Sequence, residues 1–226
     1  MRVDIISAIP DLLSGPLTNS IVGRAVKNNL VNIIIHDLHD YGKGNYKQVD
    51  DKPFGGVAGM VLSPEPLDSC IEKLKGERIY DDIIFFCPDG AHMNQALINS
   101  YSLKENLMII CGHYKGIDQR IRDLHVTREL SLGDFVISGG ELAAAVFTDA
   151  IVRIIPKAIG NEESALTDSF QDNLLAPPIY TRPASFKGME VPEVLLSGNH
   201  ANIQEWLIQK SEERTIHLRP DLNKNQ

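Results

Sequence analysis

The sequence predicts an α/β fold, in which a sheet of parallel strands is covered by helices, followed by a small helical domain. Three observations indicate this class. Short apolar runs alternate with segments of helical composition. Glycine-rich turns follow several of these runs. Beyond Pro156 the chain becomes polar and proline-rich, which predicts a domain over residues 1–160, a flexible linker over 161–172 and a small domain over 173–226.

The opening of the chain has the order strand, helix, strand. Residues 2–9 alternate between apolar and polar side chains and end at Pro10, which predicts a strand. Residues 18–28 have a helical composition, and residues 30–35 are β-branched enough for a second strand.

Two further apolar runs, residues 83–87 and 107–111, predict buried parallel strands. The first is followed by Pro88-Asp89-Gly90 and the second by Gly112, so we expect each strand to stop at a sharp turn. Ligands of open α/β sheets bind at such strand ends.

A buried helix follows the turn at residues 132–140. Ser138 and Glu141 have the spacing of a capping box, and the apolar stretch 142–155 ends before Pro156. In the last domain, Asn199 is expected to cap a helix in which Ile203, Trp206, Leu207 and Lys210 share one face.

The overall charge limits the kind of partner. Lys and Arg number 22 against 30 Asp and Glu, a net charge of −8, which argues against a protein that coats nucleic acid through bulk electrostatics. Any RNA contact must come from a local basic cluster. The best candidates are Lys115, Arg120, Arg122 and Arg128, with His113, His125, Arg182 and Lys187 nearby.

No disulfide framework, metal site or membrane segment is predicted. The three cysteines are widely spaced, and two of them lie inside apolar runs. The polar run 36–40, His-Asp-Leu-His-Asp, matches no zinc spacing and is interpreted as a loop after a strand. The apolar runs are too short to cross a bilayer, so we expect a cytoplasmic protein.

Four glycine-containing turns stand out: residues 53–60, 88–90, 112–116 and 132–140. The last three follow predicted strands in succession and therefore favour a ligand pocket. None of them has the lysine and hydroxyl residue of a P-loop, and none has the glycine spacing of a dinucleotide-binding turn. A nucleoside is therefore favoured over a polyphosphate. From the turns alone, a generic nucleotide-binding enzyme such as a reductase remains an alternative.

Six segments together resemble the bacterial tRNA (guanine-N1)-methyltransferases of the TrmD family. They are residues 53–60 (PFGGVAGM), 112–120 (GHYKGIDQR), 131–141 (SLGDFVISGGE), 167–170 (TDSF), 180–183 (YTRP) and 191–200 (VPEVLLSGNH). The resemblance runs nearly from end to end. It implies a SPOUT-type parallel sheet whose C-terminal part forms a deep trefoil knot, an exception to the rule that chains do not knot.

The resemblance also implies that the knot binds S-adenosylmethionine, the methyl donor. The cofactor-binding residues expected from the matching motifs are Pro88, Gly90, Gly112, Tyr114, Gly116, Leu132, Gly133, Asp134, Phe135, Val136, Ile137, Gly139 and Gly140. Members of the family are homodimers whose active site is shared between the subunits, and their substrate is guanosine 37 of tRNA.

Two catalytic residues are expected by the same resemblance. Neutral guanine N1 carries a proton and is a poor nucleophile, so the site needs a base for that proton and a cation for the charge that develops on O6. Asp168 matches the general base of the family and Arg153 the arginine that stabilises O6. Asp168 lies in the predicted linker, which could close over the turns and exclude water.

The sequence departs from the family at the turn that contains His113 and Lys115. Many relatives have arginine and glutamate there, and the glutamate is linked to magnesium dependence. Since Lys115 offers no carboxylate, the need for magnesium stays open. Two alternatives of the same fold also stay open, a methyltransferase for another RNA position and a non-catalytic RNA-binding module. The presence of both Asp168 and Arg153 argues against each.

Overall fold

The computed structural model describes residues 1–160 and 168–225 of the chain. It contains two compact units, Met1–Asn161 and Glu162–Gln226. The first seven residues of the predicted linker, 161–167, lie outside the described part of the chain.

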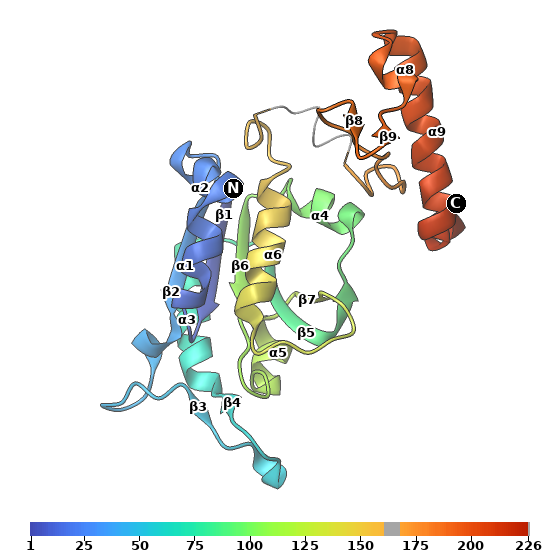
Figure 1. Ribbon diagram of the computed structural model, residues 1–226. Helices are drawn as coiled ribbons and strands as arrows, with labels where there is room; N and C mark the ends of the chain where they lie inside the picture. Colours follow the sequence, from blue (N-terminus) through green and yellow to red (C-terminus); the bar gives the residue numbers. More distant parts are fainter. Residues whose placement is uncertain (161–167, 226) are drawn as a thin grey trace. The chain divides into compact units, whose positions relative to one another are not determined.

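A five-stranded parallel sheet forms the centre of the first unit (Figure 1), which confirms the predicted class. Its strands have the order β2-β1-β6-β5-β7, and neighbouring strands pair in parallel throughout. The bounds are β1 Arg2–Ser7, β2 Asn32–Asp37, β5 Asp82–His92, β6 Asn106–Ile110 and β7 Arg128–Ser131. The predicted strand at 30–35 therefore begins two residues later.

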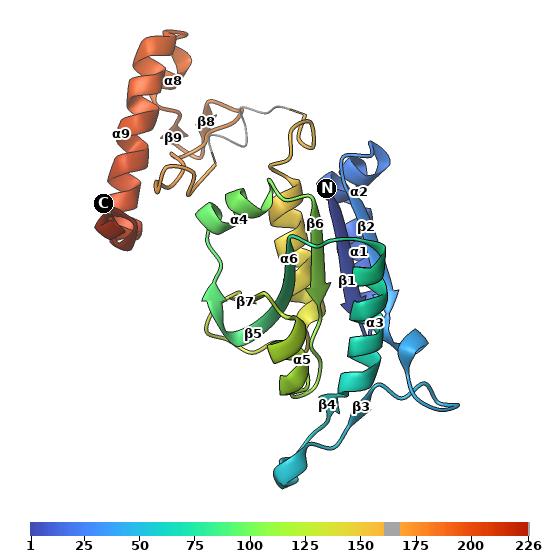
Figure 2. The same cartoon turned by 180° about the vertical axis from the view of Figure 1, so that it is seen from behind.

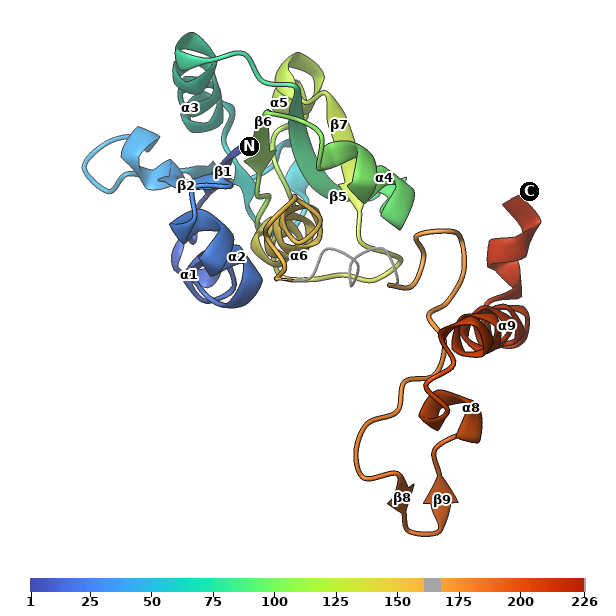
Figure 3. The same ribbon diagram turned by 90° about the horizontal axis from the view of Figure 1, so that it is seen from above.

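Helices cover both faces of this sheet (Figures 2 and 3). One face packs against α1 Asp11–Thr18, α2 Ser20–Lys27, α4 Gln95–Tyr101 and α6 Gly140–Val152. The other packs against α3 Pro64–Glu77 and α5 Gln119–His125. Side chains alternate between the two apolar layers, since Val3 and Ile5 of β1 join the first and Ile6 the second.

The segment between β2 and α3 forms a small peripheral structure. It contains η1 Leu38–Tyr41, η2 Phe54–Gly56 and the antiparallel pair β3 Asp50–Asp51 and β4 Val61–Leu62. The polar run 36–40 was expected to form a loop after a strand; instead, His36 and Asp37 end β2 and residues 38–40 lie in η1.

Helix α1 was not predicted from the sequence; its Pro16 lies inside the helix.

The expected end of the strand at Cys87 is wrong, because β5 continues to His92. Phe86 and Ala91 both pair with Leu130 of β7, so the residues between them form a bulge rather than a turn. A Cβ at Gly90 would lie 2.5 Å from the backbone nitrogen of Leu130. Glycine is therefore required here for close packing of the strands. In sequence, such a glycine cannot be distinguished from one that marks a turn.

The predicted capping box at the start of α6 is also wrong. The N-cap is Gly139, and no side chain caps the helix. The carboxylate of Glu141 is buried instead and accepts a hydrogen bond from Ser7 at 2.8 Å. The helix itself ends at Val152, three residues before the predicted end.

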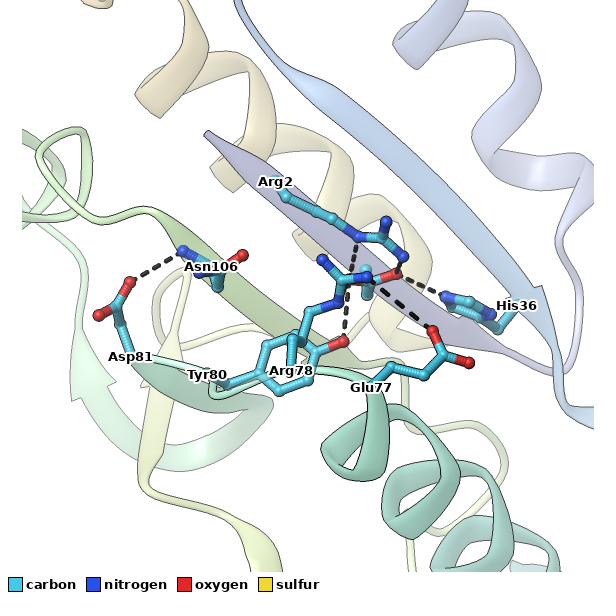
Figure 4. A network of polar contacts seen from close by, with 8 residues as sticks. Arg2, His36, Glu77, Arg78, Tyr80, Asp81 and Asn106 are labelled. Carbon is cyan, nitrogen blue, oxygen red and sulfur yellow. Dashed lines mark hydrogen bonds and ion pairs between the residues drawn. The ribbon is translucent and has the colours of Figure 1, made fainter.

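A polar network around Asp4 lies on the face of the sheet that carries α3 (Figure 4). The fully buried carboxylate of Asp4 accepts hydrogen bonds from Arg2 at 2.8 and 2.9 Å and from the Tyr80 hydroxyl at 2.9 Å. His36 Nε2 lies 2.7 Å from the same group. The network joins β1, β2 and the segment before β5.

The second unit contains a short hairpin and two helices. The hairpin pairs β8 Ser185–Phe186 with β9 Met189–Glu190, and α8 Glu193–Leu196 precedes α9 His200–Leu218 and η3 Pro220–Asn225. Asn199 caps α9, as predicted, by accepting from the backbone N–H of Asn202. Within the part of the chain that the structure describes, no helix is both long and apolar enough to span a membrane.

Candidate functional site

A pocket opens in the first unit where β5, β6 and β7 approach their carboxyl ends. Three loops surround it: the bulge after Phe86, the loop from Gly112 after β6, and the loop between β7 and α6. Its volume is about 390 Å³, within the range of small-molecule sites.

Most of the residues expected to hold the cofactor line this pocket. They are Pro88, Gly112, Tyr114, Gly116, Leu132, Gly133, Phe135, Val136, Ile137, Gly139 and Gly140. Gly90 and Asp134 are not among the lining residues. Gly90 packs against Leu130, and the exposed carboxylate of Asp134 lies 3.1 Å from His92.

Two of the loops cross at very short range. The N–H of Gly140 donates to the carbonyl of Gly112 at 2.7 Å, and Gly139 forms an isolated bridge with His113. A Cβ at Gly140 would lie 2.8 Å from the Cα of Cys111. The crossing therefore requires glycine, and it places backbone groups of both loops at the pocket.

Aromatic and aliphatic side chains form much of the pocket rim. Tyr114, Phe135 and Val136 all line the pocket, yet they remain 54%, 59% and 90% exposed. Flat apolar side chains beside backbone N–H and C=O groups suit a heterocyclic base, which needs both stacking and hydrogen bonds.

Near β5, the Arg122 guanidinium connects several groups that line or border the pocket. Arg122 on α5 donates to Glu129 at 2.7 and 2.8 Å and to Asp89 at 2.5 Å, and its guanidinium lies over the Phe85 ring. These contacts, with that to Glu129 the strongest, raise the pKa of Arg122. The hydrogen bond from Arg122 lowers the pKa of Asp89.

The same region contains a thiol and two carboxylates of metal-ligating type. Ligand atoms of Cys87, Asp89 and Glu129 lie within 4.8 Å of one another. Burial, assisted by Asp89, raises the pKa of the Cys87 thiol to about 12, so it is protonated at neutral pH. Because a thiolate is the form that binds metals and Arg122 already pairs with both carboxylates, this cluster favours a structural role.

Several lining residues lie outside the turns that the sequence predicted. They are Phe85, Phe86, Cys87, Ile117, Leu130, Ser131 and Ala143. Arg122, which was considered only for RNA contacts, also lines the pocket, as do His113 and Lys115 of the turn 112–116. Their proximity to glycines in sequence was the only available signal.

Several side chains of the predicted basic cluster already pair with acids, among them Arg122 with Glu129 and Asp89 and Arg128 with Asp82. Arg120 forms a bidentate contact with Asp118 at 2.8 and 2.9 Å. His125 is nearly buried and lies 2.7 Å from Asp68. Arg128 is largely exposed.

In the polar run 36–40, His36 contacts Asp4 and His39 contacts Asp37.

The two expected catalytic residues belong to different units. Arg153 is the C-cap of α6 in the first unit, where its N–H donates to the Asp149 carbonyl. Asp168 lies in the second unit and is partly buried. Neither lines the pocket within the first unit.

Comparison with known proteins identifies the family. The model of the tRNA (guanine-1)-methyltransferase TrmD family matches residues 1–225. Proteins named tRNA (guanine-N(1)-)-methyltransferase from Christiangramia forsetii and Bacteroides thetaiotaomicron are each 58% identical over 222 residues, which cover 98% of this chain and 98% and 99% of theirs. The protein of that name from Porphyromonas gingivalis is 54% identical over the full length of both chains. The chain belongs to the TrmD family of tRNA (guanine-1)-methyltransferases.

Proposed function

We propose that this chain transfers a methyl group from S-adenosylmethionine to N1 of guanosine 37 in tRNA. The observation that carries the proposal is the pocket of crossed glycine loops in a chain that matches the family from end to end. Because tRNA functions in the cytoplasm, the enzyme would act there.

The pocket has the properties that S-adenosylmethionine requires. Its glycine backbones leave N–H and C=O groups accessible, and Gly116 has open space where a side chain would stand. Tyr114 and Phe135 provide flat apolar surfaces for the adenine ring. When bound, the donor supplies an electrophilic methyl group on a sulfonium centre.

The reaction needs one base and one cation beyond the pocket. We assign Asp168 to accept the N1 proton of guanine while N1 attacks the methyl carbon and the carbon–sulfur bond breaks. Arg153 is assigned to stabilise the negative charge that develops on O6. The products are then 1-methylguanosine and S-adenosylhomocysteine, and the proton remains on Asp168.

The complete site is proposed to form in a homodimer, where the second unit of one subunit supplies Asp168 to the pocket of the other. An exposed apolar face supports this arrangement. Leu12 of α1 and Leu142 and Val146 of α6 are each about half exposed, and apolar surface of this kind favours association. We further propose that the crossing loops at Gly112 and Gly140 belong to the trefoil knot of the family.

Residues 173–226 are proposed to hold the tRNA, and residues 161–172 to connect them to the methyltransferase domain over 1–160. Exposed basic side chains of the second unit, such as Arg182 and Lys187, are available for phosphate contacts. At position 115 the pocket has lysine, which cannot ligate magnesium as a carboxylate does. We therefore route no step through magnesium at this position.

The test is methyl transfer from labelled S-adenosylmethionine to tRNA with guanosine at position 37, comparing wild type with Asp168→Ala. Loss of the base should lower kcat by about 10²–10⁴-fold. The affinity for S-adenosylmethionine, measured by calorimetry, should change little, because the donor pocket is untouched. A tRNA with adenosine at position 37 should not be methylated.

The matched control is Asp172→Ala, which removes a neighbouring exposed carboxylate. It should retain wild-type turnover. Wild-type turnover in Asp168→Ala would contradict the assignment of the base. Lack of S-adenosylmethionine binding by the wild-type protein would contradict the proposed function as a whole.

A further inference from the structure

A buried carboxylate at the carboxyl edge of the sheet has only half of its hydrogen-bonding capacity in use. Glu141 is 1% exposed, and its Oε1 accepts from the Ser7 hydroxyl at 2.8 Å. That hydroxyl also accepts from the N–H of Ile9 at 2.9 Å. Glu141 is thus anchored to the end of β1.

The second oxygen of Glu141 faces His113. Glu141 Oε2 lies 3.9 Å from His113 Nδ1, which is too long for a hydrogen bond. Both atoms are buried, and neither has a hydrogen-bond partner among the described residues. Leaving two such groups unpaired is costly, so a small movement that joins them would be favourable.

Gly139 fits between the two side chains. A Cβ at this position would lie 2.5 Å from both Glu141 Oε2 and His113 Nδ1. Its φ of −166° is extended backbone, which any residue can adopt. Glycine is therefore required for space, and it lets the two groups face each other beside the pocket.

His113 is connected to the wall of the pocket. It lines the pocket itself, and its ring packs edge-on against Tyr114 with centroids 4.6 Å apart. Gly112 is held by the N–H of Gly140 at the loop crossing. A shift of His113 would consequently move the Tyr114 side of the loop, while the Gly112 end stays fixed.

We propose that Glu141, anchored by Ser7, is a positioning residue that draws His113 into a hydrogen bond when the methyl donor fills the pocket. Closing the distance from 3.9 Å to hydrogen-bond length requires a movement of about 1 Å. The closed pair would fix the loop 112–116 around the donor. This inference rests on the proposed function and adds two residues to its donor site.

The experiment uses the full-length protein as wild type, Glu141→Gln, His113→Gln and the double variant. Each single change should raise the Kd for S-adenosylmethionine about tenfold, and the double change should also raise it about tenfold, because both remove one interaction. KM for the donor should rise in parallel, whereas kcat at saturating donor should stay within about twofold of wild type.

A spectroscopic readout separates this role from a merely structural one. Adding S-adenosylmethionine to the wild type should shift the Nδ1 resonance of His113 in ¹⁵N spectra, and the shift should disappear in Glu141→Gln. The matched control is His39→Gln, which removes a histidine contact with the carboxylate of Asp37 at residues that do not line the pocket. It should leave donor affinity unchanged.

His113 is in a partly exposed loop, so His113→Gln decides the question even if Glu141→Gln fails to fold. Wild-type donor affinity in either folded single variant would overturn the inference. A hundredfold loss in the double variant would do the same, because it would show two independent effects. Lack of donor binding by the wild type would instead overturn the proposed function.

Discussion

Two buried carboxylates of the first unit differ in how completely they are satisfied. Asp4 accepts hydrogen bonds from Arg2 and Tyr80 and also contacts His36, so both of its oxygens have partners. Glu141 has Ser7 on one oxygen and a gap of 3.9 Å to His113 on the other. Asp4 lies on the face of the sheet that carries α3, whereas Glu141 lies beside the pocket.

The pKa of Asp4 reflects its complete set of hydrogen-bond partners. Burial alone would raise the pKa of Asp4, but the hydrogen bonds from His36, Arg2 and Tyr80 outweigh it and lower the pKa well below its usual range. Such a network stabilises the fold. An incompletely hydrogen-bonded acid contributes less stability, but its free oxygen can accept a further hydrogen bond when a neighbouring group moves.

The largest expected effect is that of Asp4→Ala. It removes the common acceptor and leaves the partly buried donors around Asp4 without partners, so it should lower the free energy of unfolding by about 3–5 kcal/mol. Urea titration measures the loss. The control Asp123→Ala, at an exposed position of α5, should change stability by about 0.5 kcal/mol or less. Equal stability of the two variants would contradict the stabilising role of the network.

Acid should affect wild type more steeply than Asp4→Asn. Because the pKa of Asp4 is lowered in the folded state, its stabilisation is fully present above the unfolded pKa of about 3.9 and is lost as the pH falls towards the folded value. Wild type should therefore lose up to about 1.4 kcal/mol more per pH unit below pH 4. Unfolding measured from pH 5 to pH 2 tests this, and parallel curves would refute it.

The smallest expected effect on stability is that of Glu141→Gln. The amide keeps an acceptor for Ser7 and removes a buried carboxylate with one unpaired oxygen, so the free energy of unfolding should fall by no more than about 0.5 kcal/mol, or rise. Urea titration beside Asp4→Asn measures the contrast. A loss as large as that of Asp4→Asn would show that both carboxylates serve mainly the fold.

Local sequence patterns predicted much of the first unit. The alternation in residues 2–9 and the apolar run 107–111 correspond to β1 and β6, and the glycine turns correspond to most of the pocket wall. The same patterns did not reveal Arg122 as the partner of Asp89, because that contact joins residues 33 positions apart. The identity of the donor came from family resemblance, since glycine turns alone suit many nucleosides.

Local sequence patterns indicated the segments of β1, β2, β5 and β6, the helices α2, α6 and α9, the cap at Asn199 and the places where the chain could approach a ligand, because these follow from preferences of a few adjacent residues. The continuation of β5 through a bulge along β7, and the pairing of the Glu141 carboxylate with Ser7, 134 residues earlier, depend on the tertiary structure. A buried carboxylate loses its hydrogen bonds to water, so it must pair with whatever donors the fold brings to it. That choice of partner is absent from the local pattern around Ser138 and Glu141.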